Sequence, residues 1–204
     1  MKLALITSAA VALVAAVGTS MGNPLNLVGG IPDVSAGFVL ITFNATTGFF
    51  SATGATQNIS LPGPSQEPAG QREFTLTCTI SGAGVASNGS LTVKTDHNSP
   101  DSVAFSSTDL TAFGFGPTNK FEFVFSQAAG NLAPIGSDIG VILVGPGFPF
   151  PGGVPEFGSD FSNALFPGAA FGDGNADTFL IPAPSVACVG AVALLFGGRR
   201  RRTR

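Results

Sequence analysis

The sequence predicts an all-β protein, an antiparallel β-sandwich or jelly roll, flanked by an N-terminal signal helix and a C-terminal hydrophobic helix. Three observations point to this fold class. Between the two apolar ends, hydrophobic residues recur with a period of two, and turn-forming residues separate the alternating runs. No stretch there keeps the period of a helix. Parallel α/β folds are disfavoured because their strands need crossover helices.

The clearest strand runs from Phe74 to Ile80, where apolar side chains share one face and three threonines share the other. One face is therefore expected to pack and the other to meet solvent. The same pattern returns at Phe121, Phe123 and Phe125, with Glu122 on the opposite face. About seven or eight strands are expected in total. The others include the apolar runs at 39–43, 91–93, 103–105 and 140–144.

Turn residues predict where strands connect. Segment 82–89 ends in Asn88-Gly89, a pair that favours tight hairpins, and Asn98-Ser99-Pro100-Asp101 separates two further strands. We therefore expect a hairpin connection at each of these two places.

A long segment, 145–172, holds 12 Gly or Pro among its 28 residues, together with six phenylalanines. Two interpretations stay open: the rings pack back over the sheet, or they form a partner-binding surface. The first is favoured because a loop of this length persists in a compact domain when its own side chains pin it.

Charge excludes one class of partner. The chain between the two apolar ends holds all 12 acidic residues but only Arg72, Lys94 and Lys120 as basic ones, which gives a net charge of −9. Nucleic acid and anionic membranes are therefore not expected as partners.

Candidate catalytic residues are few. His97 is the one histidine, and it lies in the polar stretch Asp96-His97-Asn98, while residues 23–180 hold no Gly-x-Ser-x-Gly motif. Cys78 takes an inward position on its predicted strand, where a thiol behaves as a small apolar group. We therefore expect a solvent-exposed turn histidine, a core cysteine, no enzyme activity and no cofactor.

One stretch resembles half of a calcium loop. Asp173, Asn175 and Asp177 place three oxygen side chains at alternate positions, but Thr178 stands where such a loop turns on glycine and Pro184 where its last glutamate would fall. The preferred interpretation is a polar spacer without metal, with a weak calcium contact as the alternative.

The N-terminus has the features of a secretory signal peptide. Lys2 precedes an apolar run at 3–17, and small residues predict cleavage after Ser20 or Gly22. Pro24 then breaks any continuing helix.

The C-terminus combines three features: the motif Pro182-Ala183-Pro184, an apolar stretch at 185–198, and a basic tail. Fourteen helical residues span roughly 21 Å, short of a hydrocarbon core of about 30 Å. The tail is expected to stay cytoplasmic and to stop translocation. Its stop-transfer charges are Arg199, Arg200, Arg201, Arg202 and Arg204.

This C-terminal arrangement resembles the sorting segment of the PEP-CTERM family of bacterial surface proteins. Pro182 and Pro184 match the two prolines of the family motif, Ala183 stands in place of its glutamate, and the arginines match its basic tail. The resemblance covers about the last 24 residues. It implies recognition by an exosortase-like membrane protease and transfer to the cell surface or the extracellular matrix. A plain single-pass anchor is the alternative.

The expected organisation is a signal peptide (1–22), an exterior β-sandwich domain (23–180) and a sorting segment (181–204). The expected function is that of a non-catalytic structural or adhesive protein of the cell envelope or extracellular matrix. Its expected partners are signal peptidase, an exosortase-like protease and extracellular polysaccharide. The alternative is an exported carbohydrate- or calcium-binding module, although the chain has no Trp or Tyr to stack on sugars.

Overall fold

A computed structural model describes residues 23–61, 72–95, 103–145, 148, 150 and 154–181. These residues form ten β-strands and no helix, so no helix able to cross a membrane is found among them. The strands are β1 (Asp33–Asn44), β2 (Phe49–Ser60), β3 (Glu73–Ile80), β4 (Ala86–Lys94), β5 (Val103–Ser107), β6 (Asp109–Gly116), β7 (Lys120–Ser126), β8 (Ile139–Val144), β9 (Phe161–Ser162) and β10 (Gly174–Leu180). The two predicted flanking helices lie outside the described residues.

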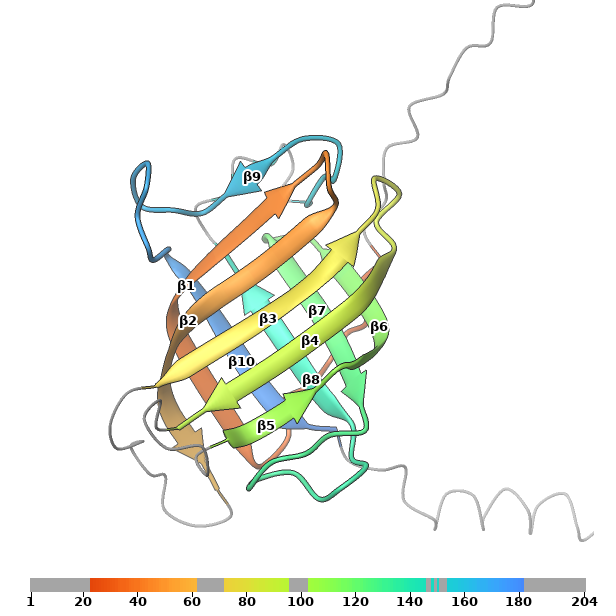
Figure 1. The fold of residues 1–204 in the computed structure, drawn as a ribbon, viewed down its shortest axis with the longest axis vertical. Helices are drawn as coiled ribbons and strands as arrows, with labels where there is room; N and C mark the ends of the chain where they lie inside the picture. The colour runs from red at the N-terminus through yellow and green to blue at the C-terminus, as the bar shows by residue number, and fades with distance from the viewer. Residues whose placement is uncertain are drawn as a thin grey trace, which may run out of the picture.

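All strand pairs are antiparallel, which confirms the predicted all-β class. The strands form one sheet in the order β5-β4-β3-β2-β1-β10-β8-β7-β6, with the short β9 paired to β1. This sheet is nearly closed into a barrel: β1 to β5 form one side, and β10, β8, β7 and β6 cross behind them (Figure 1). The two sides are therefore not separate sheets as in a sandwich, because β1 pairs with both β2 and β10.

The core lies between the two crossing sides and is rich in phenylalanine. In β3 every second residue is buried, as the alternating sequence predicts. Phe50 from β2 meets Phe121 and Phe123 from β7, with ring centroids 5.3 and 5.6 Å apart. These contacts join the front of the sheet to its back.

The two free edges of the sheet, β5 and β6, are consecutive in the chain, with only Thr108 between them. Next to these edges, β4, which is the neighbour of β5, approaches β6 where Gly89 faces Leu110. A β-carbon at Gly89 would lie 2.5 Å from the β-carbon of Leu110, so glycine allows the close approach. We call this place the seam of the sheet. It is closed by side-chain packing, because neither β4 nor β5 is hydrogen-bonded to β6 as a strand partner.

The hairpin predicted within segment 82–89 is confirmed, since β3 and β4 pair across it, but the turn does not lie at Asn88-Gly89. The turn between β3 and β4 lies earlier, where the amide of Ser81 donates to the carbonyl of Val85 at 2.9 Å. Asn88 lies inside β4, with φ of 52°, next to a shift in the β3–β4 register. Asparagine tolerates the left-handed conformation equally well in a turn and in a β-bulge, so the pair alone does not distinguish the two. The second predicted turn, 98–101, lies outside the described residues.

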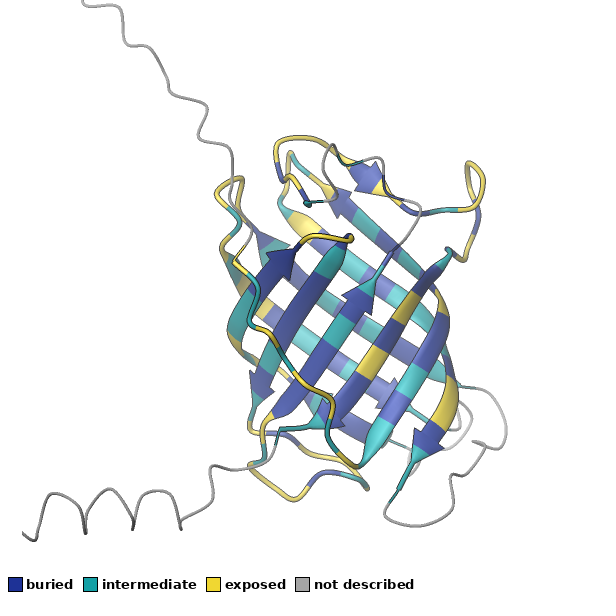
Figure 2. Cartoon of the chain, turned by 180° about the vertical axis from the view of Figure 1, so that it is seen from behind, coloured by how far each residue is buried: buried dark blue, intermediate teal, exposed yellow. Residues whose placement is uncertain are grey.

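Residues 23–32 form a segment without strand structure, called here the N-terminal strap, which crosses the outer face of the back strands (Figure 2). Gly114 of β6 makes room for it, since a β-carbon there would lie 2.6 Å from the carbonyl oxygen of Asn23. The strap buries Glu122 of β7 completely. The sequence places Glu122 correctly on the face opposite the phenylalanines, but the expectation of solvent on that face is wrong at this position.

Candidate functional site

Half of the phenylalanine-rich segment packs onto the sheet, as the favoured interpretation predicts. Phe148, Phe157 and Phe161 are at most 9% exposed and close one end of the core. Phe161 stacks on Phe43 of β1 with ring centroids 5.1 Å apart, and Phe157 meets the same ring edge-on at 5.4 Å. These rings are structural.

The other half of the segment is exposed. Phe166 and Phe171 are 56% and 43% exposed and contact each other edge-to-face at 6.1 Å, and Leu165 beside them is 55% exposed. The amide of Gly172 donates to the carbonyl of Phe38, which itself is 61% exposed. We call Phe38, Leu165, Phe166 and Phe171 the aromatic patch.

Backbone strain presents Phe38 to solvent. Its φ is 55°, a left-handed conformation that bulky side chains rarely adopt, and the β1 register shifts on both sides of it. Strain of this kind costs about 1 to 3 kcal/mol and persists only where neighbouring contacts fix it.

Asn163 supplies those contacts. Its side chain is 3% exposed, accepts a hydrogen bond from the amide of Ile41 at 2.7 Å, and donates to the carbonyl of Val39 at 2.9 Å. The same amide group also donates to Asp173 at 3.1 Å. Asn163 therefore ties the exposed loop to the bulge that carries Phe38, and the patch is held by a buried polar residue.

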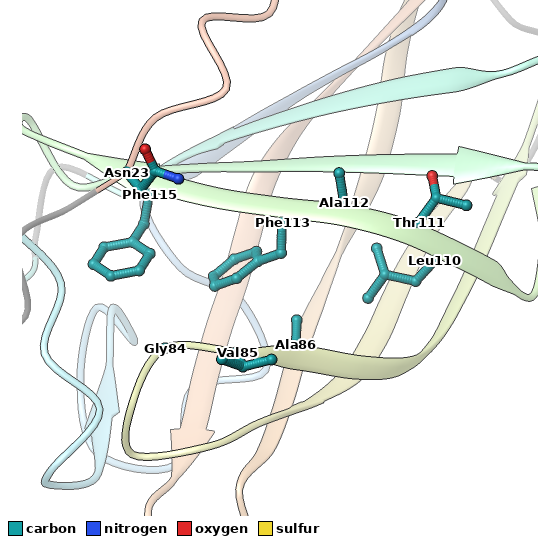
Figure 3. Close-up of a pocket in the computed structure, with 9 residues that line it drawn as sticks. All are labelled: Asn23, Gly84, Val85, Ala86, Leu110, Thr111, Ala112, Phe113 and Phe115. Carbon is teal, nitrogen blue, oxygen red and sulfur yellow. The ribbon is translucent and has the colours of Figure 1, made fainter.

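A second candidate is a cavity of about 330 Å³ at the seam of the sheet (Figure 3). Phe113 and Phe115 of β6 point to one side of their strand, towards Gly84, Val85 and the start of β4. Their rings stack at 5.7 Å. None of the residues that line this cavity carries a titratable side chain, so the cavity offers apolar contact and the polar groups of Asn23 and Thr111, but no acid or base.

The calcium-like residues do not converge. Asn175 and Asp177 are alternate residues of β10, and alternate residues of a strand lie about 6.6 Å apart. Calcium needs several oxygens within 2.3 to 2.6 Å of one point. Asp173 instead accepts a hydrogen bond from Asn163, and the described residues hold no cluster of three or more His, Cys, Asp or Glu suited to a metal. The polar-spacer interpretation is wrong, because Asn175 and Asp177 lie in β10, a central strand, and Asp173 comes directly before it.

Asp177 lies near a second carboxylate, that of Asp33. Burial, followed by the charge of Asp177, raises the pKa of Asp33 to about 6. Burial also raises the pKa of Asp177. Asp33 lies on β1 opposite Phe179, two residues from Asp177 on the paired strand, and its Oδ1 is buried without a hydrogen-bond partner in the described part of the chain. This pair destabilises the folded state when both groups are charged.

Sequence reasoning missed the role of Glu122, a carboxylate that accepts hydrogen bonds from three backbone amides. Its oxygens accept hydrogen bonds from the amides of Leu25, Asn26 and Leu27 at 2.7, 3.1 and 2.9 Å, and Lys120 lies 2.7 Å away. Burial acts to raise the pKa of Glu122, but the bonds from Lys120 and the strap amides and the charge of Lys120 together hold it below its ordinary value. An acidic residue between phenylalanines, with a lysine two positions before it, was the available signal.

Of the remaining candidates, the structure describes Cys78. Cys78 is 2% exposed in β3, and burial raises the pKa of its thiol to about 12, which confirms the predicted core position. His97, the Pro182-Ala183-Pro184 motif, the arginine tail and the signal peptide lie outside the described residues.

No protein-family model matches the chain, and no curated protein or solved structure matches it either. The case for function therefore rests on the residues and geometry above.

Proposed function

We propose that the protein is a non-catalytic adhesive or structural component of the cell envelope or extracellular matrix. In this proposal it is exported by its signal peptide, sorted by an exosortase-like protease through Pro182-Ala183-Pro184, and left at the cell surface or in the matrix. The folded part, a single nearly closed sheet, acts as a contact module. The observation that carries the proposal is the position of the aromatic patch relative to the point where the sorting segment leaves the sheet.

Strand β10 separates these two places. The aromatic patch lies at the start of β10, beside Gly172, and the predicted sorting segment follows its end at Leu180. Seven residues of strand span about 20 Å. A domain held at the cell surface through its C-terminal end therefore presents the patch on the side away from its attachment.

The chemistry of the patch suits contact with an apolar or neutral partner. Its four side chains carry no hydrogen-bonding group and no charge, and clustered exposed apolar side chains on soluble domains mark interaction sites. The net charge of −9 between the apolar ends opposes anionic partners. Adhesion through apolar contact fits both facts.

A matrix-retention assay tests the proposal. Cells producing the Phe166→Ser/Phe171→Ser variant should release the protein from washed matrix into the medium several-fold more than cells producing the native protein. Ile135→Ser is the matched control, because Ile135 is 97% exposed but lies in the β7–β8 connection. Equal retention of all three proteins would contradict adhesion through the patch.

Intact-mass measurement of the surface-extracted protein tests the sorting step. The proposal expects a mature species that has lost the arginine tail and Cys188. A species that retains both would make the chain a plain single-pass anchored protein. Replacing Arg199 to Arg202 with serine should weaken retention of the precursor in the inner membrane, since one stop-transfer arginine remains.

A further inference from the structure

The outer face of the front strands carries two uninterrupted rows of hydroxyl side chains. Strand register defines the rows, because each member lies directly opposite the next on the neighbouring strand. One row is Thr42, Ser51, Thr77 and Ser90, and the other is Thr53, Thr75, Thr92 and Ser106. Neighbouring strands lie about 4.8 Å apart, so each row repeats a hydroxyl at that interval. None of the eight residues is charged.

The second row ends in a groove. A cavity of about 270 Å³ lies over β4, β5 and the chain after β7, and its polar lining is uncharged. Hydroxyl and amide groups come from Ser90, Thr92, Ser106, Thr108 and Gln127.

One wall of the groove is fixed by hydrogen bonds. The amide and carbonyl of Ser106 pair with Ala129 at 2.7 and 2.9 Å, and the hydroxyl of Ser107 donates to the carbonyl of Ser126. Gln127, directly after β7, has a left-handed backbone with φ of 53° and also lines the groove. These hydrogen bonds give the groove a defined wall.

Several groups in the groove are free to bind a ligand. Among the described residues, the side chains of Ser90, Thr92, Thr108 and Gln127 make no hydrogen bond, whereas Ser106 donates to Ala129. Hydroxyls and an amide both donate and accept, which matches the mixed donors and acceptors of a sugar ring.

We propose that this groove, continued by the row that includes Thr92, binds a segment of a neutral polysaccharide. The inference rests on the proposed function and names a partner for it. Charge selects the ligand, since the groove and both rows are uncharged while the surrounding acidic domain repels carboxylated or sulfated polymers. Without Trp or Tyr for stacking, a single sugar is held only weakly, and a polymer that follows the row gains from repeated contacts.

Affinity electrophoresis of the mature protein tests this binding. The probes are gels that contain dextran, a mixed-linkage β-glucan or a galactomannan, with alginate as the anionic comparison. The native protein should be retarded by at least one neutral polymer and not by alginate. Thr92→Val/Thr108→Val should weaken that binding about tenfold, because valine keeps the shape of threonine and removes the hydroxyl.

Thr79→Val is the matched control, since it makes the same change on the outer face of β3, away from the groove. The control should bind like the native protein, and thermal melts should show that all variants fold. No retardation by any of the three neutral polymers, or equal retardation of the groove variant and the control, would overturn the inference. The Phe166→Ser/Phe171→Ser variant should still bind glycan, so loss of adhesion through the patch and loss of glycan binding are separable outcomes.

Discussion

The strongest perturbation available outside the core is Glu122→Gln, which tests whether the strap is held by a charged residue. The carboxylate accepts three amide hydrogen bonds and one from Lys120, and hydrogen bonds to charged groups contribute about 1.5 to 3 kcal/mol each. Glutamine keeps one accepting oxygen and turns an NH₂ group towards the remaining donors. The expected loss is about 3 kcal/mol, or a fall in Tm of roughly 6 to 12 °C for a domain of this size.

The assay is thermal unfolding of the mature protein at pH 7, with Glu156→Gln as the control because Glu156 is exposed. A control melt unchanged within about 1 °C is expected. The pKa of Glu122 is held below its ordinary value of 4.5, so its contribution is complete above that pH and is lost as the pH falls through the lowered value. The native protein and the variant should therefore converge in acid. Equal Tm values at pH 7 would refute the role given to Glu122.

Three further predictions concern the carboxyl pair, the thiol and the metal. Asp33→Asn should stabilise the domain by about 1 kcal/mol at pH 7.5. The raised pKa means that the folded form keeps a proton up to pH about 6, so the stability of the native protein falls as the pH rises from about 4 to about 6. An equal effect of the substitution at pH 4.5 would contradict this. Cys78→Ser should cost about 1 to 3 kcal/mol in denaturant unfolding, and rapid thiol labelling of native Cys78 would contradict its burial. Millimolar calcium should leave Tm unchanged, and a rise above about 5 °C would show that the domain binds it.

The strands that sequence predicted well are those whose burial alternates strictly. In β3 each apolar residue is flanked by threonine, so local pattern and tertiary environment agree. β2 and β6 were missed because Gly54 in β2 and Gly114 in β6 interrupt the pattern. These glycines are explained only by close contacts, with Val39 and with the strap respectively.

The closure of the sheet could not be predicted from periodicity. A period of two is the same in a sandwich and in a single curled sheet, because both have one buried face. What distinguishes them here is the pairing of β1 with β10, two strands almost 140 residues apart in the chain. β10 itself was mistaken for a spacer because Asn175 and Asp177, on its outer face, and Asp173, directly before it, are poor strand formers.

The candidate surfaces were only partly predictable. Composition singled out the phenylalanine-rich segment but could not separate the buried Phe161 from the exposed Phe166, since that depends on where the loop crosses the sheet. The roles of Asn163 and Glu122 depend on bonds to backbone more than 90 residues away. Such contacts leave no mark on local sequence pattern.

Labelling of a cysteine placed in the aromatic patch tests the central claim most directly. Native Cys78 is buried and should not react, so Phe171→Cys in a Cys188→Ser background gives a single accessible thiol. A membrane-impermeant maleimide should label this variant on intact cells, and the Cys188→Ser parent should stay unlabelled. Labelling that occurs only after the cells are lysed would contradict an exported domain that presents its aromatic patch to the exterior.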